Sequence, residues 1–209
     1  MKKLESSLTN MVLVLTGVAV IMGGILALVN HMTEGPINAQ KAKTLADGIK
    51  TVMCVNDITV SRTDTVKQND AKGKELTYII YQTQDAQGKD LGAAVESTTG
   101  GFGGDLKVLV GFDSEGNILG YTLLEHAETP GLGAKADKWF QKGEKGDIIG
   151  KNPKEPLTVS KDGGQVDAIT ASTITSRAFL LAVSRAYNAY KDIPATDAET
   201  GATKQVKEE

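Results

Sequence analysis

Residues 166–177 read VDAITASTITSR and decide how the carboxyl-terminal part of the chain is organised. A short apolar run comes first, a dense group of small hydroxyl residues follows, and a helical pattern then continues to Tyr190. The start of a helix presents unpaired N–H groups and partial positive charge, which together favour a phosphate. Ser and Thr are also ordinary helix N-caps, so the local pattern by itself favours plain capping. Among these hydroxyls, Thr173 is the one that we expect to carry a phosphate-linked group.

The composition excludes several classes of protein. The net charge of the 209 residues is −3, so no basic field predicts nucleic-acid binding. Cys54 is the single cysteine, which excludes an internal disulfide, a four-cysteine iron–sulfur cluster and a CxxCH haem site. We expect Cys54 to be a small buried hydrophobe. His31 and His126 lie far apart without metal-ligand spacing, so no metal site is predicted and a redox role would need an organic or borrowed cofactor.

The amino-terminal segment contains a candidate membrane span. Residues 11–29 form a run of 19 residues without a charge, nearly enough in a helix to cross a hydrocarbon core of about 30 Å. Lys2 and Lys3 precede the run, which predicts that residues 1–10 are cytoplasmic and that the following domain lies outside. The alternative is a cleaved signal peptide and a secreted form. A signal peptide has a shorter apolar core, of about 7–15 residues, and a small-residue cleavage site that LVNH at residues 28–31 does not supply.

The rest of the chain has an α+β pattern. We predict one extracytoplasmic domain over residues 30–193 and a polar, disordered tail over residues 194–209. The domain is expected to contain antiparallel strands and flanking helices. Residues typical of strands occur at 76–82, 91–98, 106–112 and 118–124.

Helices and loops complete the predicted domain. Pro36 is expected to begin a helix after the membrane span, a short helix is expected through Trp139 and Phe140, and a longer one ends near Tyr190. The glycine loop at residues 100–104 lacks the spacing of a nucleotide phosphate loop. It is therefore predicted to be a flexible connection.

A second motif, HAETPGLG at residues 126–133, follows the predicted hairpin of residues 106–124. Its Pro-Gly pair, with another Gly soon after, predicts a tight exposed turn. Behind one membrane span, this motif and the hydroxyl motif together resemble the FMN-binding domain family, and within it the G subunit of the Rnf electron-transport complex. The C subunit of the sodium-translocating NADH:quinone reductase shares both motifs and is typically longer, so it ranks second. An anchored extracytoplasmic binding module without a redox role is the remaining alternative.

The resemblance implies that a flavin transferase, with FAD as donor, joins FMN to a threonine through a phosphoester. The acceptor motif of the family reads approximately Asp-x-x-Ser/Thr-Gly-Ala-Thr. Asp167, Thr170 and the acceptor Thr173 match this motif. Ala171 and Ser172 stand where Gly and Ala are usual, and Ser172 places a second hydroxyl beside the acceptor.

Further contacts to the cofactor are implied in the same way. The helix after the acceptor would hold the phosphate at its N-terminus. Arg177, one turn on, either adds a charge-assisted contact or is ordinary solvated surface. The glycine-rich turn would bring backbone N–H groups to the flavin ring. The residues expected at the cofactor are Thr173, Asp167, Thr170, Ala171, Ser172, Thr175, Arg177, Glu128, Thr129, Gly131, Leu132, Gly133 and Lys135.

The resemblance finally implies a function. The chain would be an electron-relay subunit on the outer face of the cytoplasmic membrane, without catalytic residues of its own. It would work with the other membrane and peripheral subunits of an Rnf-type complex, which couples electron transfer between ferredoxin and NAD to ion translocation. In such a relay the cofactor carries the redox chemistry, and the protein supplies position and electrostatics.

Overall fold

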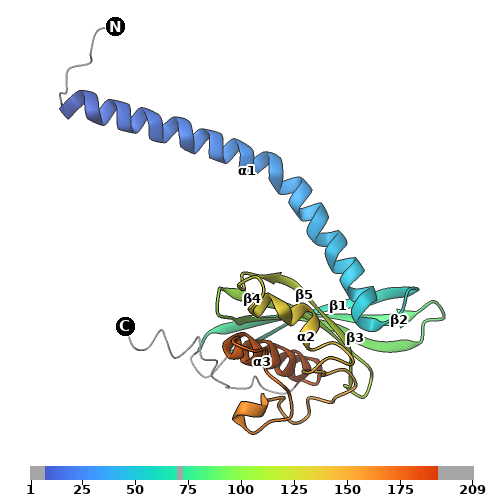
Figure 1. Cartoon of the computed structure of the whole chain (residues 1–209). Helices are drawn as coiled ribbons and strands as arrows, with labels where there is room; N and C mark the ends of the chain where they lie inside the picture. The colour runs from blue at the N-terminus through green and yellow to red at the C-terminus, as the bar shows by residue number, and fades with distance from the viewer. Residues whose placement is uncertain (1–7, 70–72, 193–209) are drawn as a thin grey trace. The chain divides into compact units, whose positions relative to one another are not determined.

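An antiparallel five-stranded sheet forms the centre of the folded domain (Figure 1). The computed structural model describes residues 8–69 and 73–192. The strands pair in sequence order, each with the next, so the sheet is a simple meander. With flanking helices, this confirms the α+β prediction. The strands are β1 (Ile58–Asn69), β2 (Glu75–Asp85), β3 (Asp90–Gly100), β4 (Asp105–Phe112) and β5 (Ile118–His126).

Four of these strands contain the predicted segments, and β1 was missed. In β3 and β4 most residues are buried, because both faces of the central strands are covered. β1 pairs with β2 alone and is mostly exposed. Its polar sequence ITVSRTDTVKQN therefore shows only a weak hydrophobic alternation, and its position comes from the pairing with β2.

Helix α3 (Thr173–Tyr190) packs on one face of the sheet and completes the main core. Figure 1 shows it lying across the sheet. Phe179 stacks on Phe140 with ring centroids 4.3 Å apart, and it meets Tyr121 edge-to-face at 4.7 Å. The Thr99 hydroxyl of β3 donates to the carbonyl of Ala178 at 2.9 Å. These contacts hold the second turn of α3, and with it the start of the helix, in one position relative to the sheet.

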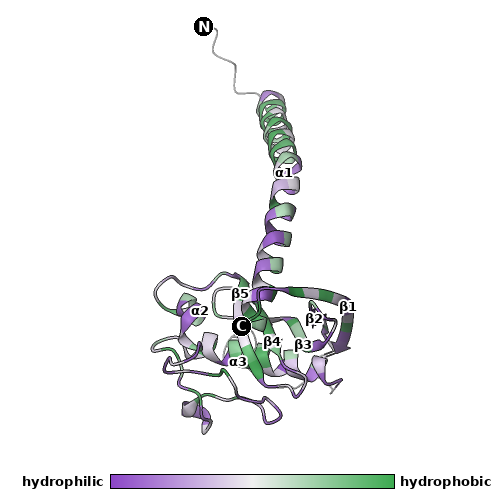
Figure 2. Ribbon diagram, turned by 90° about the vertical axis from the view of Figure 1, so that its right-hand side faces the viewer, coloured by the Kyte–Doolittle hydropathy of each residue, from purple (hydrophilic) through white to green (hydrophobic). Residues whose placement is uncertain are grey.

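Helix α1 (Leu8–Met53) is continuous, so the predicted helix start at Pro36 is wrong. Pro36 lies inside the helix, where it removes one backbone hydrogen bond without ending the element. Within the described residues, α1 alone is long and apolar enough to cross a membrane. In Figure 2 its first half is mostly green, whereas purple residues prevail further along. The chain divides into two compact units, residues 1–44 and residues 45–209.

The last turns of α1 belong to the second unit and cover the other face of the sheet. Ile49, Val52 and Met53 are buried there against Tyr81 and Leu109 among others. Two paired glycines permit this close contact. A Cβ atom at Gly111 would lie 2.3 Å from the Val52 carbonyl oxygen, and one at Gly120 would lie 2.9 Å from it.

Cys54 follows α1 directly, and it differs from the prediction. It is exposed and has a φ of +57°, because the helix ends there in a left-handed residue. Its thiol donates to the carbonyl of Leu119 at 3.5 Å. Cys54 is therefore a helix-end residue and not part of the core.

Short elements connect β5 to α3. They are η1 (Gly133–Lys135), α2 (Ala136–Trp139) and η2 (Ser160–Asp162). The predicted helix near Trp139 is thus present as a single turn. Between α2 and α3, Val159 and Val166 form one isolated parallel bridge. The predicted tail at residues 194–209 lies outside the described residues.

Candidate functional site

A pocket of about 390 Å³ opens beside the first turn of α3. Three segments that are distant in the sequence form its wall: the glycine loop after β3, the turn after β5, and the start of α3. Its volume lies within the range of small-ligand and cofactor sites. The lining residues are Phe102, Glu128, Thr129, Leu132, Gly133, Ala171, Ser172, Thr173, Ile174 and Thr175.

The start of α3 carries the residues of the acceptor motif. Ser172 is the N-cap residue, yet its side chain makes no capping hydrogen bond, so plain capping does not explain the hydroxyl cluster. Thr173 is the first helical residue and is half-buried. Ala171 has a φ of +60°, in the left-handed region that favours glycine. This backbone conformation explains why the motif usually has Gly at that position.

Glu128 joins the three segments of the pocket wall. The residue is 6% exposed. One carboxylate oxygen accepts from the Thr175 hydroxyl at 2.7 Å, and the other accepts from the Phe102 N–H at 2.7 Å and the Gly103 N–H at 3.4 Å. A Cβ atom at Gly133 would come within 2.4 Å of this carboxylate, so only glycine permits the approach. Glu128 therefore lines the pocket and also fixes its shape.

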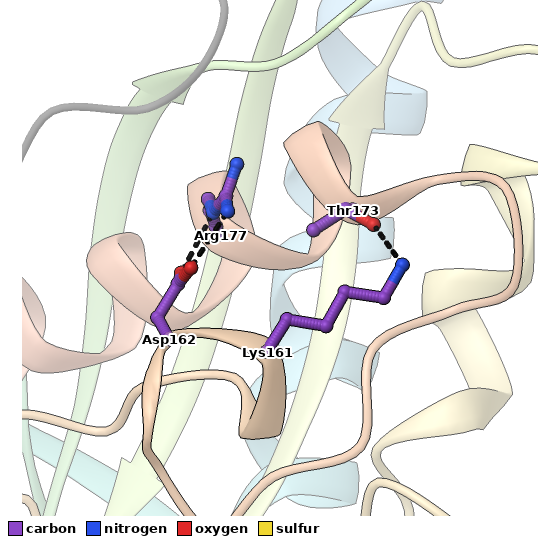
Figure 3. Close-up of polar contacts among 4 residues, drawn as sticks. All are labelled: Lys161, Asp162, Thr173 and Arg177. Carbon is purple, nitrogen blue, oxygen red and sulfur yellow. Dashed lines mark hydrogen bonds and ion pairs between the residues drawn. The ribbon is translucent and has the colours of Figure 1, made fainter.

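Two contacts connect η2 to the first turns of α3, as Figure 3 shows. The Lys161 Nζ donates to the Thr173 Oγ1 at 3.2 Å. The guanidinium of Arg177 donates two hydrogen bonds of 2.7 Å to the Asp162 carboxylate. The hydrogen bond from Arg177 lowers the pKa of Asp162, and the same pairing raises the pKa of Arg177. Arg177 is thus paired with a carboxylate and does not line the pocket.

Four other predicted residues do not line the pocket: Asp167, Thr170, Gly131 and Lys135. Asp167 accepts a hydrogen bond from the Ser160 hydroxyl at 3.1 Å, and its backbone carbonyl accepts from the Trp139 indole at 2.8 Å. It therefore shapes the loop that leads into the acceptor motif. Gly131, with a φ of +77°, forms the predicted turn. Thr170 and Lys135 are exposed.

Three residues at this site were not predicted from the sequence. Phe102, which is 59% exposed, projects from the glycine loop that was predicted to be a flexible connection. Ile174 lines the pocket beside Thr173. Lys161 reaches Thr173 from 12 positions away. A single aromatic residue between glycines was a usable signal for Phe102, whereas nothing in the local sequence singles out Lys161.

The residues present fit a flavin phosphate better than a metal ion. No group of three potential metal ligands occurs among the residues that the structure describes. The pocket instead combines apolar walls, from Phe102, Leu132 and Ile174, with a hydroxyl at a helix N-terminus that has no side-chain cap. Apolar walls suit an aromatic ring, and free N–H groups at a helix start suit a phosphate.

Comparisons with known proteins agree with this geometry. A model of the FMN-binding domain family matches residues 101–188, a range that contains every residue lining the pocket. The G subunit of the ion-translocating oxidoreductase complex of Vibrio cholerae serotype O1 (strain M66-2) is 33% identical over 180 residues, covering 83% of this chain and 86% of the relative. The corresponding protein of Shewanella oneidensis is 34% identical over 175 residues, covering 80% and 82%. That of Aliivibrio fischeri (strain MJ11) is 40% identical over 130 residues, covering 60% and 61%.

The chain contains an FMN-binding domain, and the pocket lies within its matched range. The chain belongs to the family of G subunits of ion-translocating oxidoreductase complexes. This confirms the resemblance drawn from the two sequence motifs.

Proposed function

We propose that this chain carries FMN joined covalently to Thr173 and relays electrons as the G subunit of an Rnf-type ion-translocating complex. One observation carries the proposal. Thr173 stands in the wall of the pocket, at the uncapped start of α3, within the range matched by the FMN-binding family. A phosphate bonded to its oxygen would lie at the N–H groups of that helix turn.

The attachment needs a flavin transferase and FAD. The Thr173 oxygen bonds to the phosphorus of the FMN half of FAD, and the pyrophosphate bond breaks. AMP leaves and the hydroxyl proton is released, so the chain gains one FMN less one water. No redox change accompanies this transfer. A phosphoester cannot be lost by dilution, which suits a cofactor held on the outer side of a membrane.

The residues of the pocket would position the attached group. The FMN supplies one- and two-electron redox chemistry when it is bound. Phe102, Leu132 and Ile174 offer apolar contact area for the flavin ring, and the turn at Thr129–Gly133 offers backbone groups near it. The Glu128 carboxylate holds the glycine loop after β3 against the start of α3. It does so by accepting hydrogen bonds from the Phe102 N–H and the Thr175 hydroxyl.

The membrane placement follows from α1. We infer that the apolar first part of α1 spans the cytoplasmic membrane, with the N-terminus inside and the flavin domain outside. The other membrane and peripheral subunits of the complex would then be its partners, and ferredoxin and NAD the ends of its electron path. The names of the relatives support the complex, and orientation and donors are part of the proposal.

The test is the intact mass of the full-length chain, co-expressed with a flavin transferase and followed by peptide mapping. We expect one FMN less water on the peptide that contains Thr173. Thr173→Ser and Ser172→Ala should keep the modification, and Thr173→Ala should lose it at a cost in stability of about 1 kcal/mol, since Thr173 is half-buried and makes one side-chain hydrogen bond. An unmodified wild-type chain without flavin absorbance would support the binding-module alternative. Covalent flavin on Thr173→Ala would move the attachment site to another hydroxyl.

A further inference from the structure

Lys161 places a positive charge at the proposed attachment oxygen. Its ammonium group donates to the Thr173 Oγ1 at 3.2 Å (Figure 3). The motif that predicts the acceptor does not include Lys161, because the two residues are 12 positions apart. Within the part of the chain that the structure describes, Lys161 forms no ion pair, so its charge is available to an incoming anion.

The turn that carries Lys161 is held firmly against α3. Val159, just before η2, is 1% exposed and bridges to Val166, which is 2% exposed. On the other side of Lys161, the Asp162 carboxylate receives both hydrogen bonds from Arg177, one turn into α3. A buried residue and a bidentate ion pair therefore flank Lys161 and bring its side chain to the acceptor.

The ion pair between Arg177 and Asp162 gives Arg177 a different role from Lys161. Both hydrogen bonds that the structure gives the Arg177 guanidinium go to the Asp162 carboxylate, which offsets its charge and fixes the guanidinium plane there. The Lys161 ammonium has three donors and uses one of them on Thr173. It is therefore the group able to bond the ester oxygen and a neighbouring phosphate oxygen together.

We propose that Lys161 is the positioning residue for phosphoryl transfer to Thr173, holding the hydroxyl and the FMN phosphate of the FAD donor together. This inference rests on the proposed attachment at Thr173. In the step, the Thr173 oxygen bonds to the phosphorus, the bond to the AMP oxygen breaks, and the hydroxyl proton passes to solvent. The Lys161 ammonium keeps its proton throughout and remains paired with the phosphodiester, which retains one negative charge.

The experiment follows the rate of flavin attachment to the purified full-length chain in detergent, with purified flavin transferase and FAD. Lys161→Gln should lower kcat by about tenfold or more, the equivalent of one charge-assisted hydrogen bond, with the KM for the chain unchanged. Lys161→Arg should restore most of the rate because it keeps the charge. Raised salt should slow the wild type more than Lys161→Gln, because it screens an exposed charge.

Lys89→Gln is the matched control, since it removes the same charge from an exposed lysine in the turn between β2 and β3. It should react at the wild-type rate, and all variants should share the wild-type thermal unfolding curve. Wild-type kcat in Lys161→Gln would overturn the role of Lys161 while attachment at Thr173 stands. A raised KM with unchanged kcat would also overturn it, by indicating a docking contact with the transferase. A wild-type chain that accepts no flavin would instead overturn the proposed function.

Discussion

At the residue scale, Ala171 adopts a backbone conformation that favours glycine. Its φ of +60° places an L-residue with a side chain in the left-handed region, which costs roughly 1–2 kcal/mol. It stands immediately before Ser172 and Thr173, so the turn that it forms leads into the residues at the start of α3 that line the pocket. The usual glycine of this motif meets a conformational need of the turn and makes no contact that alanine lacks.

We therefore predict that Ala171→Gly stabilises the domain. The removal of left-handed strain outweighs the extra entropy of a glycine in the unfolded chain, leaving a net gain of about 0.5–1 kcal/mol. Urea unfolding measures the difference. Ala127→Gly is the control, because Ala127 is exposed and is not among the residues with positive φ. The control should lose about 0.5 kcal/mol. Equal losses in both variants would mean that Ala171 is not strained.

At the scale of elements, one buried carboxylate, that of Glu128, connects three separate segments of the domain. Glu128 ties the glycine loop after β3 and the turn after β5 to the first turn of α3. The glycine loop was predicted to be flexible, and it is held because two of its backbone N–H groups donate to this carboxylate. Phe102 is thereby held at the pocket.

Glu128→Ala should destabilise the domain by about 2–4 kcal/mol, because it leaves the buried Thr175 hydroxyl and the Phe102 N–H without their acceptor. Hydrogen bonds to charged groups are the stronger kind. Glu128→Gln keeps one carbonyl acceptor and should lose about half as much. Glu144→Ala, at an exposed position, should lie within about 0.5 kcal/mol of the wild type. Urea unfolding at one pH compares the stability of the three variants with that of the wild type. A Glu128→Ala variant as stable as the wild type would show that the loops keep their positions without the carboxylate.

At the scale of the whole molecule, α1 contributes residues to both compact units of the chain, residues 1–44 and residues 45–209. Its first part is exposed and apolar, as a membrane span requires. Its last turns bury Ile49, Val52 and Met53 on the sheet and belong to the flavin domain. The domain predicted from the sequence begins at residue 30, whereas the compact unit of the structure begins at Leu45. A continuous helix passes through both positions.

Two truncations test this division. A chain that begins at Leu45 should fold in water without detergent, with a cooperative urea transition. A chain that begins at Asn56 should lose roughly 4.5–9 kcal/mol, because each of the three buried side chains contributes about 1.5–3 kcal/mol. Such a loss is comparable to the whole stability of an ordinary domain, so this chain should be unfolded or aggregated. If both truncated chains unfold at the same urea concentration, the end of α1 does not stabilise the sheet.

The sequence by itself determined the features that depend on neighbouring residues. The uncharged run before residue 30, the strand-forming residues of β2 to β5 and the hydroxyl cluster before α3 are all local patterns, which can be read from neighbouring residues. The family could be read from two short motifs for the same reason. β1 was not predicted, because an exposed edge strand needs little hydrophobic alternation.

Only the tertiary structure decided which distant residues share the pocket. Phe102 reaches it because Glu128 binds its loop, Lys161 meets Thr173 because η2 is fixed to α3, and Arg177 is paired because Asp162 lies opposite. Each of these contacts joins segments at least 12 positions apart. No local period encodes such a contact, since it depends on how the sheet, the loops and α3 pack together.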